Sequence, residues 1–548
     1  MKNLSTIMIL IILFGFGQNS NATNIVTRVS GKVNWSDATT WYKALDGDVS
    51  ITKNSKVLFG KNTSFTKDVK PGDFIFVSSA EQISGVVKNI LSDVQLELEN
   101  PVSNSLSGAY GTGAIPSADD EVMIGNVSNG GDLELTYTST FQQIKSLTFA
   151  STAHNTKLIF ASGASIKIAK DVIFNQPSAD NKKNTWEVGT STILIDGSLQ
   201  SILNTLGGHR MVEMYVTGGA VTINKDFNFT SVGNTPEQII SMNHAQFTIH
   251  GAFQMHSGTW NNIGNTVLQF NDQFVFGGIN LPQFNSDAKT QIYFNGDMDL
   301  KELLSNLVLD GNSQTTLVGK INIFTPASKA LISFGNLLVD ADAMVNLNGN
   351  IWVAGNLQSK GGSIYSGNHK VWLSGKNKTI GGTSSSNLGS LYIYGGRASS
   401  YTVISNVSCS KINFPSSISN SSLNIQKGVT LNVLGDIIIQ QPAAPSASAL
   451  NVGSGTAQVS GDVSLGGHYQ IPSQISKISI SDGFLNINGN LVFNTMPASP
   501  QTAIIDMSTG NGSINLKGEL ITSNKTGILN TGIDEKRLHF VDESSPSL

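Results

Sequence analysis

Two pairs of aspartates are spaced so that both carboxylates of a pair would point to one side of a β-strand: Asp297/Asp299 and Asp340/Asp342. A glycosidase needs two carboxylates about 5–9.5 Å apart to flank the bond that it cleaves. The same spacing is typical of an exposed strand face or a turn, and this interpretation is favoured for both pairs. A third acidic group, Asp119-Asp120-Glu121, is predicted to cap a turn.

A polysaccharide lyase would instead need a basic side chain near an acidic cluster. The chain has four arginines, and His209-Arg210 beside Glu213 is the most suggestive local group. This group follows Gly207-Gly208, so a polar turn is the favoured interpretation.

Three histidines, His244, His250 and His256, recur six residues apart and could share one face of an unbroken strand as metal ligands. Extended at about 3.3 Å per residue, they would span some 40 Å, too far for one ion. Exposed polar positions are therefore predicted. Cys409 is the only cysteine, so no cysteine pair can form. We predict no catalytic residue, no metal ligand and no cofactor.

Aromatic residues offer a different chemistry, since sugars stack on exposed rings. Trp35 and Trp41 lie near the start of the chain, where an aromatic cover for the first repeat is the favoured interpretation. Tyr392, Tyr394 and Tyr401 are alternatives for glycan contact.

The elements that would position these residues come from a repeat. The pattern apolar-x-apolar-x-Gly-polar-apolar-x-apolar returns about every 27 residues from roughly residue 160 to 525, which is typical of a solenoid. The glycines of its copies are Gly197, Gly251, Gly296, Gly319, Gly349, Gly435, Gly461, Gly489 and Gly518, while Lys170 and Lys225 hold the same place in two more.

Alternation within a repeat predicts strands. Every second residue from Val345 to Val353 is apolar or glycine, and asparagines fill the places between Val345 and Ile351. Glycine is then expected inside a bend, where a side chain would collide with the coil or where φ is positive. The Asp or Asn that often follows is expected to bond its own backbone, as at Asp297, Asn350, Asp436, Asp462 and Asn490.

These features predict an all-β fold, a right-handed parallel β-helix (β-solenoid) with a small nested β-module near the N-terminus. A period of about 27 residues leaves room for three short strands per coil. A row of antiparallel β-sandwiches is the alternative, but it would repeat in units of about 100 residues.

Five segments are predicted: a signal peptide at 1–22, an N-terminal cap with the tryptophan motif at 23–45, an inserted β-module at 46–112, β-helix repeats at 113–529 and a C-terminal tail at 530–548. The net charge is -4, which gives no basic footprint for nucleic acid. No later segment is apolar and long enough for a transmembrane helix.

The segment Trp35-Ser-Asp-Ala-Thr-Thr-Trp41, continued at 116–124, resembles a motif of secreted surface proteins of the Bacteroidetes. The stretch between the two halves is similar to modules of phage and bacterial surface fibres. Residues 144–149 and 371–382 resemble repeats of large adhesin-like β-helix proteins in the same bacteria. The resemblance implies work at the cell surface and export by the type IX route, although 530–548 is too short for the sorting domain of such cargo.

The expected function is that of a secreted or cell-surface, non-catalytic, adhesin-like display scaffold. Its expected partners are glycans, surfaces or other surface proteins. Two alternatives stay open at this point: a polysaccharide lyase or glycosidase on the same scaffold, and an accessory component of the gliding or type IX secretion machinery.

Overall fold

The computed structural model describes most of the 548 residues, and the predicted signal peptide lies outside the described part. The described ranges are 23–77, 83–125, 131–202, 210–230, 238–277, 282–287, 289–300, 306–309, 313–324, 331–394, 398–416, 419–467, 473–495, 502–523, 528–531 and 537–541.

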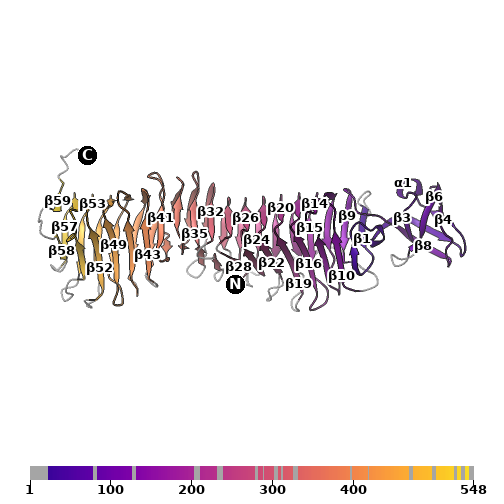
Figure 1. The fold of residues 1–548 in the computed structure, drawn as a ribbon, viewed down its shortest axis with the longest axis horizontal. Helices are drawn as coiled ribbons and strands as arrows, with labels where there is room; N and C mark the ends of the chain where they lie inside the picture. Colours follow the sequence, from indigo (N-terminus) through magenta and orange to yellow (C-terminus); the bar gives the residue numbers. More distant parts are fainter. Residues whose placement is uncertain are drawn as a thin grey trace, which may run out of the picture.

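The chain winds into a long rod of parallel β-strands, with a small module at its N-terminal end (Figure 1). The predicted all-β parallel β-helix is confirmed, and one turn takes about 25 residues. Adjacent coils pair strand by strand in parallel, as in Ile193↔Val221 and Leu485↔Ile514. Parallel pairing excludes a row of antiparallel sandwiches for the repeats.

Three sheets enclose the interior. One sheet of 17 strands runs from β11 (Gln142–Ile144) to β58 (Ile528–Asn530). A second face is formed by 8 strands up to β28 (Gln283–Ser286) and is continued by 10 strands from β31 (Asn306–Val308). The third face begins with β1 (Thr23–Thr27), continues through β9 (Asp120–Ile124) and ends in a 6-stranded sheet that finishes at β59 (Leu538–Phe540).

Coil length varies along the rod because the corner loops differ in length. A long coil separates Ile193 from its partner Val221, whereas a much shorter one separates Leu337 from its partner Leu357. The shorter coils bring the mean below the predicted period.

Alternation along each strand fills the interior as predicted. In β36 (Met344–Asn348) and β37 (Ile351–Val353), Val345, Leu347, Ile351 and Val353 are buried, while the residues that alternate with them within each strand face outward. Phenylalanines of successive coils stack inside the N-terminal half, for example Phe253 on Phe274 with ring centroids 4.7 Å apart. Each coil thus buries its apolar face against its neighbours.

The segment Trp41–Gly113 forms an antiparallel module with a hydrophobic cluster of its own, which includes Phe65, Leu96 and Tyr110. Its elements are β3 (Trp41–Ile51), β4 (Val57–Lys61), α1 (Phe65–Asp68), β5 (Phe74–Val77), β6 (Ile83–Ser92), β7 (Gln95–Leu98) and β8 (Leu106–Gly113).

The first coil of the rod comes from residues that precede this module. β1 (Thr23–Thr27) pairs in parallel with β9, and β2 (Gly31–Asn34) pairs with β10 (Leu133–Tyr137). The module is therefore an excursion between the first coil and the second. At its base, the ring of Trp35 packs 4.7 Å from that of Trp41 and 5.2 Å from that of Tyr137.

Glycine marks the corners because the backbone of the preceding coil passes directly beside it. A Cβ added to Gly489 would lie 2.6 Å from the carbonyl carbon of Gly461, whereas carbon atoms in contact need about 3.5–4.0 Å. Gly251 meets Lys225 in the same way. Neither Gly251 nor Gly489 has a positive φ, so collision between coils is the reason for glycine at these corners.

The Asp or Asn that follows the glycine at many corners bonds the next coil, and not its own backbone as predicted. The Asp462 carboxylate accepts a hydrogen bond of 2.7 Å from the backbone N–H of Asn490. The Asn490 side-chain oxygen in turn accepts from Glu519 at 2.9 Å. The same bond joins Asp297 to Asn322, Asn350 to Lys370 and Asp436 to Asp462. Because the coils stack in register, a backbone N–H at the corresponding corner of the following coil lies within hydrogen-bond reach of each of these Asp or Asn side chains.

β59 pairs in parallel with β56 (Ser513–Leu516), so part of the predicted tail joins the stack. No helix in the described ranges has the length and apolar character needed to cross a membrane.

Gly489→Ala tests the corner packing. We expect it to lower the free energy of unfolding by about 1–3 kcal/mol, the usual cost of overpacking, because the methyl group must displace the Gly461 backbone. Chemical denaturation followed by circular dichroism measures the change. Lys225→Ala is the matched control, since this corner position already carries a Cβ. Equal stability of Gly489→Ala and the wild type would contradict the interpretation.

Candidate functional site

One carboxylate of each predicted pair is held by the scaffold. Asp297 accepts hydrogen bonds from the backbone N–H and the side-chain amide of Asn322, at 2.7 and 2.9 Å. Asp299 lies in β30 (Met298–Leu300), but its side chain is outside the described part. Asp340 forms an ion pair of 3.2 Å with Lys360, and Asp342 is exposed in the same turn.

The acidic group near the start of the repeats has a structural partner as well. The Asp120 carboxylate accepts from the backbone N–H and the hydroxyl of Ser117, at 2.7 and 2.6 Å. Asp120 is 2% exposed, and its bonds to Ser117 close the turn before β9. The side chain therefore caps a turn.

Arg210 and Glu213 have different partners. The Arg210 guanidinium forms an ion pair of 3.0 Å with Asp180, and it lines a depression of about 310 Å³ beside Gln176. Glu213 is 4% exposed and pairs with Lys183 at 3.1 Å on the adjacent strand. His209 lies outside the described residues. The arginine and the glutamate are therefore each neutralised by a separate neighbour.

The three histidines occupy three successive corners of one coil. His244 lies between β22 (Gln238–Asn243) and β23 (Gln246–Ile249). His250 precedes β24 (Phe253–Met255), and His256 follows it. His244 and His250 bond asparagines beside them. In the described part of the chain, no three His, Cys, Asp or Glu side chains are grouped to hold an ion.

Three of the aromatic candidates are buried. Trp35 and Trp41 are 1% and 0% exposed, so neither presents a face to a sugar. Tyr401 is fully buried, where its hydroxyl donates to the Val353 carbonyl and accepts from the Gly375 N–H, both at 2.8 Å. Tyr401 therefore joins three coils and does not contact a ligand.

Tyr392 and Tyr394 belong to a cluster of four rings on the outer face of the rod. Trp352 on β37 pairs in register with Trp372 on β40 (Val371–Leu373), which pairs with Tyr392 on β42 (Ser390–Ile393). All four side chains are partly exposed. We call Trp352, Trp372, Tyr392 and Tyr394 the aromatic ladder.

Stacking between coils organises the aromatic ladder. The Trp352 and Trp372 rings stack at 5.2 Å with an interplanar angle of 16°, and Tyr392 lies 5.1 Å from Trp372. Tyr394 packs nearly perpendicular to both indoles, at 4.8 and 5.8 Å. Each such pair contributes about 0.5–1.5 kcal/mol beyond its buried area. The stacked indoles cover each other's faces, so the ladder presents mainly ring edges and its two ends.

A lysine lies over the middle of this ladder. The Lys370 ammonium is 5.2 Å from the centre of the Trp372 ring and 4.8 Å from that of Tyr392, which are cation–π distances. The ladder is therefore amphipathic, with apolar ring edges and a fixed positive charge beside them.

The sequence reasoning found Tyr392 and Tyr394 but missed Trp352 and Trp372. A signal was present: each tryptophan lies between two inward-facing apolar residues, in Ile351-Trp352-Val353 and Val371-Trp372-Leu373. Alternation alone therefore turns both rings outward. Recognising the ladder also required the register between coils, which aligns Trp352 with Trp372.

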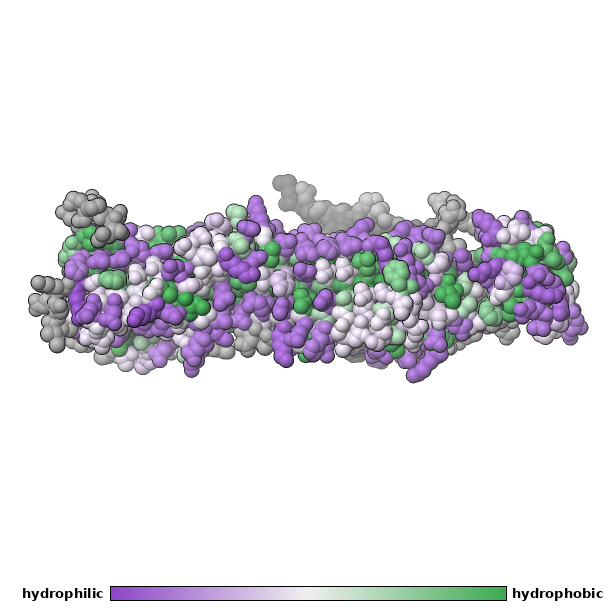
Figure 2. Space-filling model, turned by 45° about the horizontal axis from the view of Figure 1, so that its top comes forward, coloured by the Kyte–Doolittle hydropathy of each residue, from purple (hydrophilic) through white to green (hydrophobic). Residues whose placement is uncertain are grey.

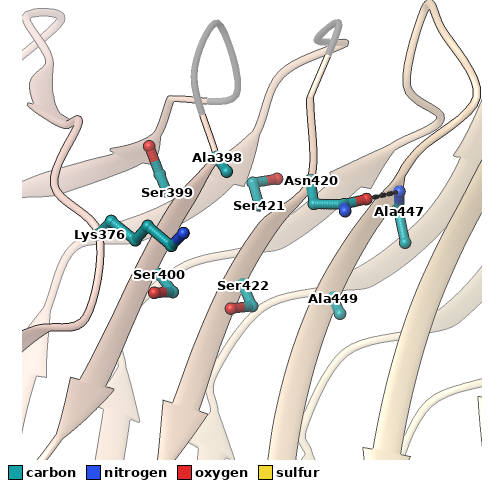
Figure 3. A pocket seen from close by; sticks show the side chains of 9 residues that line it. All are labelled: Lys376, Ala398, Ser399, Ser400, Asn420, Ser421, Ser422, Ala447 and Ala449. Carbon is teal, nitrogen blue, oxygen red and sulfur yellow. Dashed lines mark hydrogen bonds between the residues drawn. The ribbon is translucent and has the colours of Figure 1, made fainter.

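A shallow depression of about 210 Å³ lies around the corner from the ladder, on the 17-stranded sheet (Figure 3). Its floor is formed by Ser400, Ser422 and Ala449, which pair in register on β43 (Ser399–Val403), β46 (Ser421–Ile425) and β49 (Ala447–Gly453). The Lys376 side chain reaches over its edge (Figure 3). Small side chains hollow the surface here, but ordinary ligand pockets are larger and begin at about 300 Å³.

Comparison with known proteins adds no family to this picture. Neither the protein-family models, nor the curated proteins, nor the solved structures contain a match to the chain. Function must therefore be inferred from the residues themselves.

Tyr401→Phe tests the structural assignment of this residue. The change leaves the Gly375 N–H and the Val353 carbonyl without their partner, so we expect a loss of about 1–3 kcal/mol in the free energy of unfolding. Tyr365→Phe, at an exposed ring, is the control. Denaturation curves that coincide for Tyr401→Phe and the wild type would contradict it.

Buried tyrosines also predict an alkaline limit to stability. Burial raises the pKa of Tyr137 to about 12, and it raises the pKa values of Tyr110 and Tyr401 further. An unfolded tyrosine ionises near pH 10. Above that pH the unfolded chain binds fewer protons than the folded one. Burial also raises the pKa of the Cys409 thiol to about 12, whereas an unfolded cysteine ionises near pH 8.5. The thermal midpoint should therefore begin to fall above about pH 8.5 and fall more steeply above about pH 10. A midpoint that stays level to pH 11 would contradict the prediction.

Proposed function

We propose that the protein is a secreted or cell-surface, non-catalytic β-solenoid that acts as an adhesin-like display scaffold. The observation that carries the proposal is the aromatic ladder, a partly exposed cluster of four rings on a rod whose other outward positions are mostly polar. Figure 2 shows this mixed surface, with small apolar areas set among hydrophilic ones. Exposed aromatic side chains of this kind are typical of recognition surfaces.

The partners of the candidate catalytic residues support a role without chemistry. Asp297, Asp340 and Glu213 each bond a neighbouring coil, so their charges are used to hold the stack together. Outward rows of polar side chains repeat at the coil spacing of about 4.8 Å. A rod of this kind suits an extended ligand that is bound by many weak contacts.

Secretion is part of the proposal and rests on the sequence. Residues 1–22 have the charge, apolar run and small-residue end of a signal peptide. β1 begins at Thr23, so cleavage after Ala22 would leave the first strand intact.

The mature N-terminus is the first test of this proposal. We expect the protein recovered from the outside of cells to begin at Thr23, as measured by mass spectrometry of its N-terminal peptide. The intact sequence from Met1, found only inside the cell, would contradict secretion.

A double variant of the aromatic ladder tests the binding surface. Trp352→Ser with Trp372→Ser introduces the residue that Ser333 already provides at the paired position of the preceding coil. We expect binding of the purified rod to intact cell surfaces and immobilised glycans to weaken about tenfold or more, which corresponds to about 1.4 kcal/mol. Tyr365→Ala, an exposed aromatic change outside the ladder, should bind normally.

Circular dichroism and thermal melting must show that the double variant is folded. Unchanged binding by the folded double variant would contradict the assignment of the ladder. Ultraviolet absorbance from unsaturated products on incubation with acidic glycans would favour a lyase and contradict a non-catalytic role.

A further inference from the structure

Charge is distributed unevenly along the rod. Residues 343–435 contain no aspartate or glutamate, whereas the whole chain has 38 acidic residues and a net charge of -4. The same segment, which we call the acid-free belt, contains seven basic residues. These seven are Lys360, Lys370, Lys376, Lys378, Arg397, Lys411 and Lys427.

Elsewhere on the rod, lysines are commonly paired with a carboxylate one coil away. Examples are Lys157 with Glu187 at 2.8 Å, and Lys477 with Asp506 at 3.0 Å. These pairs neutralise the charges on the outer face. Like charges stacked on successive coils would repel each other and destabilise the rod. The acid-free belt departs from this arrangement.

The borders of the belt still follow the rule. Lys360 pairs with Asp340 at 3.2 Å, and Lys411 lies 3.8 Å from Asp436. Between them, neither Lys370 nor Lys376 forms an ion pair with a carboxylate in the described part of the chain. Two ammonium groups are thus left for an anion from outside.

These two lysines lie on either side of the strand that carries Trp372. Lys370 precedes β40 and lies over the aromatic ladder. Lys376 follows β40, at the corner that leads to the depression lined by Ser400 and Ser422. Lys411 is in the same row as Lys370, two coils further on, with Ser390 between them. The aromatic ladder therefore has Lys370 on its own face and Lys376 at the corner between this face and the 17-stranded sheet.

The chemistry of this surface favours an acidic polysaccharide over nucleic acid. Proteins that bind single strands without sequence preference stack bases on open ring faces, whereas Trp352 and Trp372 cover each other's faces. Duplex DNA carries one negative charge for roughly every 1.7 Å of its axis, and would need a denser row of cations. A sugar chain presents hydroxyl oxygens to the positively polarised ring edges and to serines, and a carboxylate or sulfate to each ammonium.

We propose that the aromatic ladder, with Lys370 and Lys376, binds an anionic polysaccharide whose carboxylate or sulfate groups replace the carboxylates missing from the acid-free belt. The chain would lie across the strands, along the rod, so that successive sugars meet successive coils. This inference rests on the proposed function, and it names the ligand class of the display surface.

The experiment measures binding of the full-length mature protein to two matched pairs of polymers by biolayer interferometry. Polygalacturonate is compared with its methyl ester, and dextran sulfate with dextran, so that charge changes while the backbone stays the same. We expect binding to at least one anionic polymer, at least tenfold weaker binding to its neutral match, and weakening with added salt.

Variants then locate the site. Lys370→Glu with Lys376→Glu should weaken binding of the anionic polymer about tenfold or more, and the milder Lys370→Gln with Lys376→Gln should weaken it in the same direction. Lys427→Glu is the matched control, because it is exposed in the same belt but lies at a corner on another side of the rod. It should retain binding within about twofold.

Three outcomes would overturn the inference. The first is equal binding of charged and neutral polymers, and the second is an equal loss of binding with Lys427→Glu. The third is tighter binding of single-stranded DNA that is lost in the double lysine variant. If the wild type binds cells or neutral glycans through the ladder but neither anionic polymer, this inference fails while the proposed function stands. If it binds none of them, both fail.

Discussion

The structure depends on the close, in-register contact between each coil and the next. At the glycine corners this contact leaves no space for a side chain, as Gly461 and Gly489 illustrate. At many corners an Asp or Asn also fixes the coils by bonding the N–H of the following one, as Asp462 does. The register between coils is therefore set by the backbone pairing of the strands and by the hydrogen bonds at the corners. It does not depend on equal coil length. Long and short coils stack equally well because the difference is placed in loops.

Much of the fold could be predicted from the sequence because alternation is a local property. The burial of Val345, Leu347 and Val353 follows from residues two apart, and so does the parallel stack, since the pattern repeats. The bond from Asp462 to Asn490 could not be predicted, because it joins residues of successive coils whose alignment depends on every loop between them. For the same reason the sequence indicates Tyr392 and Tyr394 only as separate residues. Recognising that Trp352 and Trp372 are their partners requires the register between coils.

Residues that suggest chemistry in a sequence become structural when they are stacked. A carboxylate that faces outward from a coil finds an N–H, an amide or a lysine on the neighbouring coil, as Asp297 and Glu213 do. Spacing within one strand is therefore a poor guide to an active site in a solenoid. The places where this mutual neutralisation stops are more informative. A charge that has no partner on the neighbouring coil is available to a ligand from outside.

The position of the β-module has a consequence for the order in which the chain folds. β1 pairs with β9, and Thr23 lies opposite Asp120 in this pair. The whole module separates these two strands in the sequence, so the pair forms only when the two ends of the module are brought together. The module shortens that search, because its own antiparallel sheet brings β3 and β8 side by side near its base. A module that folds first would act as a clamp that lowers the entropic cost of closing the first coil. Lesions in the module's interior, around Phe65 and Tyr110, would then slow assembly of the N-terminal end of the rod, although neither residue lies in the solenoid.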